Sequence, residues 1–350
     1  MAWLERGATV ATSVLSGLIV AAVVKAVNSG VADGVVILWF ALAAIGAGAA
    51  VWLAGILLRR RKRPARAFFI TSAFREKYYV AAFVQRLHEL LDLEHIDLVL
   101  KVPDRDYHAS AQSRHLVRLA DRRREYLGGV IFAAEASRLR GDLITFCRKS
   151  RLPVVFTDIE PFDRADDYPE NTAYVGYDTG ELGALAGQWL VRQLRRTDHP
   201  HVLIIASCEH NARQQRCEKV LRAARPDVSI TTNDQCAFIR SRAHDAVRSH
   251  IRHLDPGQRL DAVFCTNDEM ALGAVDALSA TPATQATVVI GVDGILEART
   301  LIDSSQSPLR ATVVQDTDRL TGEVVNLLLK MRRGDKAKKR TILPGEIYEA

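Results

Sequence analysis

Charge is almost absent from the first 58 residues of this 350-residue chain. Residues 7–27 carry a single charge, Lys25, and residues 35–58 carry none. About 20 apolar residues in a helix are enough to cross the hydrocarbon core of a bilayer. We therefore predict a two-span transmembrane hairpin over residues 1–58, which makes the protein a multi-pass component of the cell membrane. A cleaved signal peptide is the alternative for the first run, but its apolar stretch is long and no clear A-x-A cleavage site follows it.

Positive charge returns immediately after the second run. Residues 59–66 hold six basic and no acidic residues, and this basic juxtamembrane linker accounts for the whole formal net charge of +6. The remaining body is neutral, which argues against nucleic-acid binding. Basic residues close to a span favour the cytoplasmic side of the membrane. We therefore expect the soluble domain in the cytoplasm, with the periplasmic or extracellular face as the alternative.

Signatures of catalysis and metal binding are also missing. The sequence has no CxxC pair, HExxH, P-loop, GxSxG or GxGxxG, so we predict no enzyme activity, no cofactor and no metal site. The histidines are interpreted as surface or helix-face residues. Cys147, Cys208 and Cys265 lie in apolar stretches that predict a core position. Five cysteines without a disulfide pattern favour a reducing compartment.

Apolar runs alternate with helical periodicity from residue 67 onwards. The predicted strands are 68–71, 97–102, 129–133, 153–157, 201–206, 261–265, 287–291 and 309–314. Helical patterns between them include 79–91, 181–195, 269–278 and 317–332. This alternation predicts an α/β fold, with two doubly wound parallel-sheet lobes whose sheets are covered on both faces.

Polar and aromatic residues follow several of these strands. Ligands of parallel sheets bind at the carboxyl ends of the strands, where the following loops converge. Carboxylates, amides and aromatic rings at that edge suit a small polar ligand. Asp268 is expected to cap the helix that follows it. Helix capping is also an alternative role for the neighbouring Asn267, and core packing is one for Tyr78 and Tyr79.

One series of motifs resembles a known family. The string NDEMALGA at residues 267–274, then GVDG at 291–294 and Gln315, resembles in order the sugar-binding periplasmic proteins of the ribose-binding type. That family also supplies the effector domains of lactose-repressor-type regulators. The resemblance covers about residues 67–348 and implies lobes joined by a multi-strand hinge, with Val175 to Asp178 as the first crossing. It implies an N-terminal lobe at about 67–176 and 315–340, and a C-terminal lobe at about 177–314 and 341–350.

The same resemblance implies a set of ligand-binding residues. Asp158, Asn267, Asp293 and Gln315 would bond ligand hydroxyls, Tyr78 and Tyr79 would stack on the ligand, Ser72, Arg75 and Glu76 would line the N-terminal lobe, and Arg213 would be the arginine at the start of a second-lobe helix. Two features depart from the family. Ile159 stands where sugar binders commonly carry arginine, and Arg75-Glu76 is more charged than the usual amide-rich loop. A charged or amino sugar, or a site that has lost sugar binding, therefore stays open.

These observations lead to one main functional hypothesis and three alternatives. The main one is a membrane-anchored sensor without enzyme activity, whose lobes close on a small polar ligand, a carbohydrate. A signalling partner, or a second protomer in a homodimer, would read this closure. The first alternative is an anchored solute receptor of an ABC-type sugar importer, with the domain outside the membrane. A transcription regulator is disfavoured because the predicted hairpin occupies the place of a DNA-binding motif. A ligand-free scaffold is the last alternative.

Overall fold

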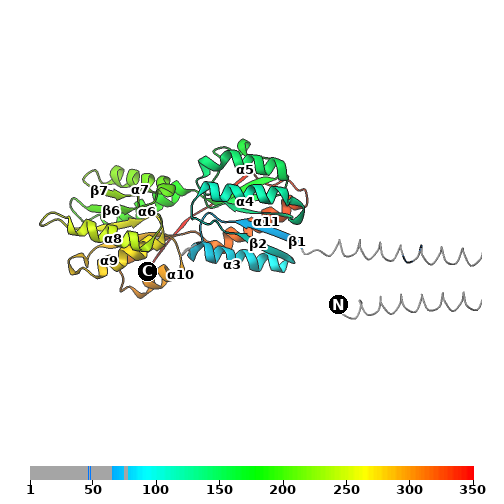
Figure 1. Cartoon of the computed structure of the whole chain (residues 1–350). Coiled ribbons are helices and arrows are strands. Elements are labelled where there is room, and N and C mark those ends of the chain that lie inside the picture. Colours follow the sequence, from blue (N-terminus) through cyan, green and yellow to red (C-terminus); the bar gives the residue numbers. More distant parts are fainter. Residues whose placement is uncertain (1–45, 47, 49–64, 75–77) are drawn as a thin grey trace, which may run out of the picture. The chain divides into compact units, whose positions relative to one another are not determined.

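Two separate parallel sheets organise residues 65–350 in a computed structural model of the chain (Figure 1). The structure describes residues 65–74 and 78–350, together with residues 46 and 48. The predicted transmembrane hairpin thus lies outside the described residues, apart from those two positions. Within the described part, none of the helices combines the length and the apolar content that crossing a membrane requires.

The first sheet has six strands in the order β11-β5-β4-β3-β1-β2, and all of its neighbours pair in parallel. Its strands are β1 (Ala65–Ile70), β2 (Ile96–Lys101), β3 (Gly128–Phe132), β4 (Val154–Thr157), β5 (Thr172–Tyr177) and β11 (Arg340–Leu343). The strands β3, β4 and β5 are buried along their whole length. Continuous burial is expected for central strands that helices cover on both faces.

The second sheet repeats this arrangement in the order β12-β10-β9-β8-β6-β7. Its strands are β6 (His201–Ile205), β7 (Ser229–Asn233), β8 (Ala262–Cys265), β9 (Val288–Asp293), β10 (Leu309–Val314) and β12 (Glu346–Glu349). All pair in parallel except β12, which runs antiparallel to β10 at the edge.

Helices cover both faces of each sheet. They are α3 (Tyr78–Leu93), α4 (Ala109–Asp121), α5 (Ala136–Ser150), α6 (Thr179–Gln193), α7 (Asn211–Ala224), α8 (Arg240–Arg252), α9 (Asp268–Ser279), α10 (Leu296–Ser304) and α11 (Thr317–Arg332). Short 3₁₀ turns lie at Arg123–Glu125, Ala165–Asp167, Cys208–His210 and Pro282–Thr284. In the first lobe α3 packs beside α11 and α4 beside α5; in the second, α6 packs beside α7 and α8 beside α9.

The alternation of side chains along β1 shows how the sequence builds this layering. Phe68 and Phe69 are both fully buried but belong to different core clusters. Successive residues of a strand point to opposite faces. Phe68 therefore meets Phe146 of α5 edge-on at 5.8 Å, whereas Phe69 meets Phe83 of α3 at 5.4 Å. One pair of phenylalanines thus attaches helices to both faces of the sheet.

The α/β fold with two parallel-sheet lobes is confirmed. Three connections join the lobes, after β5, after β10 and between β11 and β12. The Tyr177 hydroxyl donates to the Asp316 carbonyl at 3.2 Å, which links the first connection to the second. The strand β11 continues the first sheet to Leu343, a few residues past the boundary expected at 340.

Some details of the sequence-based expectation were wrong. The edge strands β7, β11 and β12 were not predicted, because they are exposed or only partly buried and lack a long apolar run. The residues of β5 were interpreted as a crossing, but they form a buried strand, and the crossing follows it. Cys208 is exposed, whereas Cys147 and Cys265 are buried as expected, and all five cysteines are free thiols.

Candidate functional site

A cavity lies where the carboxyl ends of strands from both sheets meet. Its free volume is about 40 Å³. The first lobe lines it with Tyr78, Tyr79, Val80, Tyr107, Asp158 and Ile159, and the second lobe and its crossing line it with His210, Arg213, Phe238, Asn267, Glu269, Asp293, Ile295 and Gln315. A ligand held here would contact both lobes at once.

Arg213 is the buried cation of this cavity. It is the third residue of α7, and its side chain is 2% exposed. One terminal nitrogen, Nη1, donates to the Thr266 carbonyl at 2.7 Å and lies 3.7 Å from Oδ1 of Asp293. Its Nε is buried and has no hydrogen-bond partner among the described residues, which is uncommon for a buried N–H.

Asp293 and Gln315 form a second polar element of the cavity. The Gln315 amide nitrogen donates to Oδ1 of Asp293 at 2.8 Å, and both side chains are buried. Asp293 is the last residue of β9 and has φ of 126°, a backbone conformation that side-chain-bearing residues rarely adopt. Burial raises the pKa of Asp293 well above its usual range, and the charge of Arg213 opposes this effect. Gln315 itself lies in the crossing between β10 and α11.

Asn267 and Asp268 have roles that are the reverse of the simplest expectation. Asn267, and not Asp268, caps α9, because its side-chain oxygen accepts the Met270 N–H at 3.0 Å. The carboxylate of Asp268 instead accepts the N–H groups of Gly294 and Ile295 at 2.7 and 2.9 Å. It also accepts the Thr312 hydroxyl at 2.7 Å. Asp268 therefore holds the loop that follows Asp293.

Asp158 supplies the carboxylate of the first lobe. It follows β4 directly, and its φ of 68° is in the left-handed region. The Tyr174 hydroxyl donates to its backbone carbonyl at 3.1 Å. No residue in the described part of the chain donates a hydrogen bond to its carboxylate, and Arg213 is the cation whose charge acts on it there. Burial raises the pKa of Asp158 to about 6.

Aromatic side chains form the walls of the cavity. Tyr107, in the loop after β2, packs on Phe238 of the second lobe with ring centres 4.9 Å apart. Phe238 also meets the ring of His210 at 4.5 Å. Tyr79, in the first turn of α3, is partly buried, and burial raises its pKa well above the usual value. Tyr78 beside it is 59% exposed and lies at the edge.

The structure brings most of the predicted site residues together. Seven of them line the cavity, namely Tyr78, Tyr79, Asp158, Arg213, Asn267, Asp293 and Gln315. Ser72 does not line it; this residue is buried, and its carbonyl accepts the Tyr107 N–H at 2.7 Å. Arg75 and Glu76 lie outside the described residues. Contact of all these residues with a ligand stays a prediction.

Sequence reasoning missed several lining residues. His210 was interpreted as a surface or helix-face residue, but it is buried and its Nδ1 lies 3.2 Å from the Thr266 carbonyl. Tyr107, Phe238 and Glu269 were not predicted to contact a ligand. Tyr107 could have been identified as a candidate site residue, because it lies in the loop after a predicted strand. Phe238 follows β7, which was itself not predicted, so the pattern offered no such signal for it.

The unliganded protein is expected to lose stability as pH rises through the titration of Asp158. Burial raises the pKa of this carboxyl from 3.8 to about 6, so between these values the folded state retains a proton that the unfolded state has released. Stability from this group is therefore present below about pH 4 and lost as pH passes 6. One pKa unit corresponds to about 1.4 kcal/mol, which makes the loss about 2 kcal/mol for a partly exposed group.

Urea denaturation near pH 4.5 and near pH 7.5 measures this change. Asp158→Asn removes the titration, so the variant should lose less stability than the wild type over the same interval. An equal decline in both proteins would contradict the assignment to Asp158.

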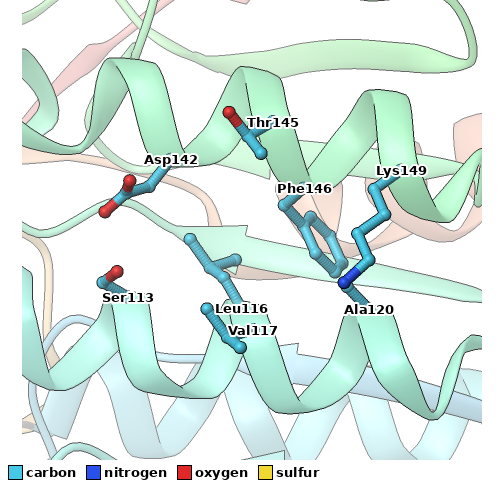
Figure 2. A pocket seen from close by; sticks show the side chains of 8 residues that line it. All are labelled: Ser113, Leu116, Val117, Ala120, Asp142, Thr145, Phe146 and Lys149. Atoms are coloured by element: carbon cyan, nitrogen blue, oxygen red, sulfur yellow. The ribbon is translucent and has the colours of Figure 1, made fainter.

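A second cavity lies between α4 and α5, away from the strand ends (Figure 2). Its volume is about 110 Å³, and Figure 2 shows Leu116 and Phe146 on the two helices that enclose it. Lys149 at this cavity pairs with Asp121 at 2.9 Å. All of its lining comes from one lobe, so a ligand there would not connect the two lobes.

Comparisons with known proteins agree with this geometry. A family model described as a periplasmic binding protein domain matches residues 69–336. The putative rhizopine-binding protein of Rhizobium meliloti is 25% identical over 201 residues, which are 56% of this chain and 63% of that protein. The D-allose-binding periplasmic protein of Escherichia coli is 25% identical over 168 residues, 47% of this chain and 52% of that protein. The matches thus span about half to two thirds of these relatives.

Solved structures show the same fold. A periplasmic solute-binding protein of an ABC transporter from Actinobacillus succinogenes, with bound D-allose, superposes with a TM-score of 0.72. The two chains are 16% identical, and the superposition covers 81% of this chain and 97% of that one. The matching family and the structural neighbours are solute-binding proteins and not enzymes.

Proposed function

This chain belongs to the family of periplasmic binding protein domains, and on that premise we propose that its two lobes close on a small polyhydroxylated ligand, a sugar or a close chemical relative. One observation carries the proposal: carboxylate, amide, guanidinium and phenol groups from both lobes converge on one small cavity. A few convergent polar groups among aromatic walls are what a site for a small polar ligand requires.

The chemistry of the cavity suits neighbouring hydroxyl groups. A carboxylate accepts hydrogen bonds from two hydroxyls, while an amide both accepts and donates. Asp293 and Gln315 already lie 2.8 Å apart and present these functions side by side. Arg213 adds a buried guanidinium group whose Nε has no hydrogen-bond partner among the described residues. The partly buried ring of Tyr79 offers an apolar face to the C–H groups of a ring.

Closure of the lobes would be the response to the ligand. Each lobe supplies part of the cavity, so a bound ligand makes its full set of contacts when the two approach each other. Gln315 stands in a connection between the lobes, which couples the site directly to the hinge. A ligand must favour the closed state by about 3–5 kcal/mol to change the populations decisively.

We further propose that residues 1–58 anchor this domain in the membrane with the domain on the cytoplasmic side, as a sensor. The support is the pair of apolar runs and the six basic residues at 59–66. A partner protein, or a second copy of the chain, would read the closure. An enzymatic reporter fused after Ala350 that is active only outside the cytoplasm tests the orientation, and activity of that fusion would contradict the sensor.

A solute receptor for an importer is the second candidate. The observation that favours it is the similarity to a solute-binding protein of an ABC transporter, which covers 97% of that chain. This candidate uses the same cavity but requires the opposite orientation, so the reporter fusion separates the two.

Asp293→Ala is expected to abolish ligand-induced stabilisation. A thermal-shift panel of pentoses, hexoses, amino hexoses and inositols should identify compounds that raise the melting temperature of the wild type. The variant loses a central acceptor of the cavity but also removes a buried carboxyl, whose burial is costly. The strain at φ of 126° is unchanged, because alanine also carries a Cβ. The variant's own melting temperature should therefore not fall below that of the wild type, while its ligand response is lost.

Asp276→Ala is the matched control for this experiment. Asp276 lies on the exposed side of α9, where it pairs with Arg240 at 2.9 Å. This variant should keep the full ligand response. The proposal would be refuted if no compound of the panel stabilises the wild type, or if Asp293→Ala responds like the wild type.

A further inference from the structure

We propose that the end of the first lobe opposite the cavity binds the headgroups of anionic phospholipids and so holds the domain against the membrane surface. This surface, which we call the basic end, consists of residues 121–125, 148–151 and 330–339. The inference rests on the proposed anchoring by residues 1–58. It is independent of the ligand and of the side of the membrane on which the domain lies.

Three segments meet at the basic end because of how the first sheet is built. The cavity lies at the carboxyl ends of the strands, and the helices between parallel strands run back to the amino ends. Lys149 near the end of α5 pairs with Asp121, the last residue of α4, at 2.9 Å. The segment after α11 joins them, since Nζ of Lys339 donates to the carbonyls of Pro169 and Thr172, where β5 begins, at 2.7 and 3.3 Å.

Positive charge is concentrated in these three segments. They contain twelve basic and three acidic residues, although the charges of residues 67–350 sum to zero. Two of the acidic side chains are already paired, Asp121 with Lys149 and Glu125 with Arg122. Apart from Arg122, Lys149 and Lys339, the nine remaining basic residues are exposed, and none forms an ion pair with an acidic residue of the described chain.

Other acidic residues at this end of the lobe do not neutralise the excess. Asp92, Glu94 and Asp97 lie at the end of α3 and the start of β2, and β2 is the edge of the sheet opposite β11. Glu170 acts on Lys339, which is not one of the nine. The unpaired positive charge therefore lies around the amino ends of β3, β4, β5 and β11.

The helix dipole explains only part of this pattern. Basic residues in the last turn of a helix are stabilised by the negative end of the dipole, and the effect fades beyond that turn. Lys330 and Arg332 lie in the last turn of α11. Arg124 follows α4, however, and Lys336 and Lys338 follow α11. Exposed charges of one sign repel one another, so the excess outside the helices favours an anionic partner.

The path of the chain favours a membrane as that partner. The Leu127 N–H donates to the Arg66 carbonyl at 2.8 Å, so the start of β1 lies beside the turn that follows α4. The basic residues of the linker 59–66 directly precede and begin this strand. Only residues 59–64 separate the predicted span from Ala65, and a chain of that length reaches at most about 25 Å. The linker and the basic end would therefore meet the same surface.

A nucleic acid suits the basic end less well. Proteins that bind single strands stack the bases on exposed aromatic side chains. The three segments contain no aromatic residue, and Tyr126, which follows the first of them, is buried. Anionic headgroups require no such platform, because clusters of lysine and arginine next to a span attract them through charge alone.

Lysine acetylation of the full chain in bilayer discs tests the inference. The discs contain phosphatidylcholine alone or mixed with phosphatidylglycerol, and mass spectrometry gives the acetylation rate of each lysine. Phosphatidylglycerol should slow acetylation of Lys330, Lys336 and Lys338 at least threefold at about 0.1 M salt, where charges act over about 10 Å, and much less at about 1 M, where they act over about 3 Å. Lys219, exposed on α7 of the second lobe, should not change.

A variant with three charges removed assigns the effect to the basic end. Combining Arg332→Gln, Arg333→Gln and Lys336→Gln should return the acetylation rate of Lys330 in phosphatidylglycerol discs towards its rate in phosphatidylcholine discs. All three side chains are exposed and lack an ion pair within the described chain. The melting temperature of the variant should therefore match that of the wild type, which shows that the fold is kept.

Arg195→Gln combined with Arg196→Gln is the matched control. Both arginines are exposed and follow α6 in the second lobe, and neither forms an ion pair with a described residue. They lie towards the amino ends of the second sheet, and the carboxyl ends of both sheets meet at the cavity, so this surface is far from the basic end. The control should keep the full protection of Lys330.

The outcomes separate this inference from the anchoring on which it rests. A chain that inserts into the discs but shows equal acetylation in both lipids would overturn the inference and leave the anchoring standing. Protection that persists in the triple variant would also overturn it. Protection by polyuridylate in phosphatidylcholine discs, with none from phosphatidylglycerol, would assign the basic end to a nucleic acid. If the chain does not insert into discs, the anchoring fails and the inference fails with it.

Discussion

Replacing Asp268 by alanine is expected to lower the free energy of unfolding by about 3 kcal/mol and to abolish ligand binding. The carboxylate is fully buried and accepts hydrogen bonds from two backbone amides and from Thr312. A buried donor that loses its partner costs about 1–3 kcal/mol. Three donors lose their acceptor here, but removing a buried charge also removes its desolvation cost and so offsets part of the loss in stability. The loop that follows Asp293 would lose its support at the same time.

Chemical denaturation and ligand titration check this expectation together. Asp268→Asn should be intermediate, because its oxygen can still accept from the Gly294 and Ile295 amides while its amide group faces the Thr312 oxygen. Asp276→Ala on the same helix removes a surface ion pair with Arg240 and should cost less than about 1 kcal/mol. A cost of Asp268→Ala as small as that of the control would contradict the role assigned to this carboxylate.

Gly183→Ala is expected to destabilise the second lobe by about 3 kcal/mol and to displace Arg213. Gly183 lies in α6 where this helix crosses α7, and an added Cβ would overlap the backbone carbonyl of Arg213. Backbone atoms cannot rotate away as a side chain does, so the two helices must separate, and overpacking of this kind costs about 1–3 kcal/mol or more. Ligand affinity should fall with stability, because Arg213 enters the cavity from that point of α7.

Gly141→Ala is the control for the loss of a glycine from a helix. Gly141 lies in α5, and a Cβ there would meet no atom within 4 Å. Alanine favours the helix by about 0.8–1 kcal/mol over glycine. Thermal unfolding should therefore show a small gain for Gly141→Ala and a large loss for Gly183→Ala. Similar changes in both variants would show that helix propensity, and not the crossing of α6 and α7, determines the result.

Much of the fold could be predicted because it follows from local periodicity. The alternation of apolar runs and helical patterns predicted two parallel-sheet lobes, and the resemblance to the sugar-binding family implied seven residues that share one cavity. The pattern did not predict the edge strands β7 and β12, because each pairs with a neighbour on one side only and is largely exposed. Their backbone hydrogen bonds, and not buried side chains, hold them in the sheet, so an apolar pattern does not mark them.

The roles of individual polar residues were harder to predict. Asn267 and Asp268 are neighbours that both resemble helix caps in the sequence. Their different roles depend on Gly294 and Thr312, which are 26 and 44 residues away from Asp268 and reach it through the packing of β9 and β10 against α9. Tyr107 and Phe238 come from different lobes, and their contact exists because the two strand-end edges face each other.

The sequence by itself determined the charge distribution, the α/β alternation and the identity of the polar groups at the strand ends. These depend on residue type and on spacing along the chain. Only the tertiary structure decided which of those groups have hydrogen-bond donors within the protein. Asp268 and Asp293 receive donors from distant segments, whereas Asp158 receives none from the described residues. That difference arises because hydrogen-bond partners are set by proximity in space, which spacing along the chain does not determine.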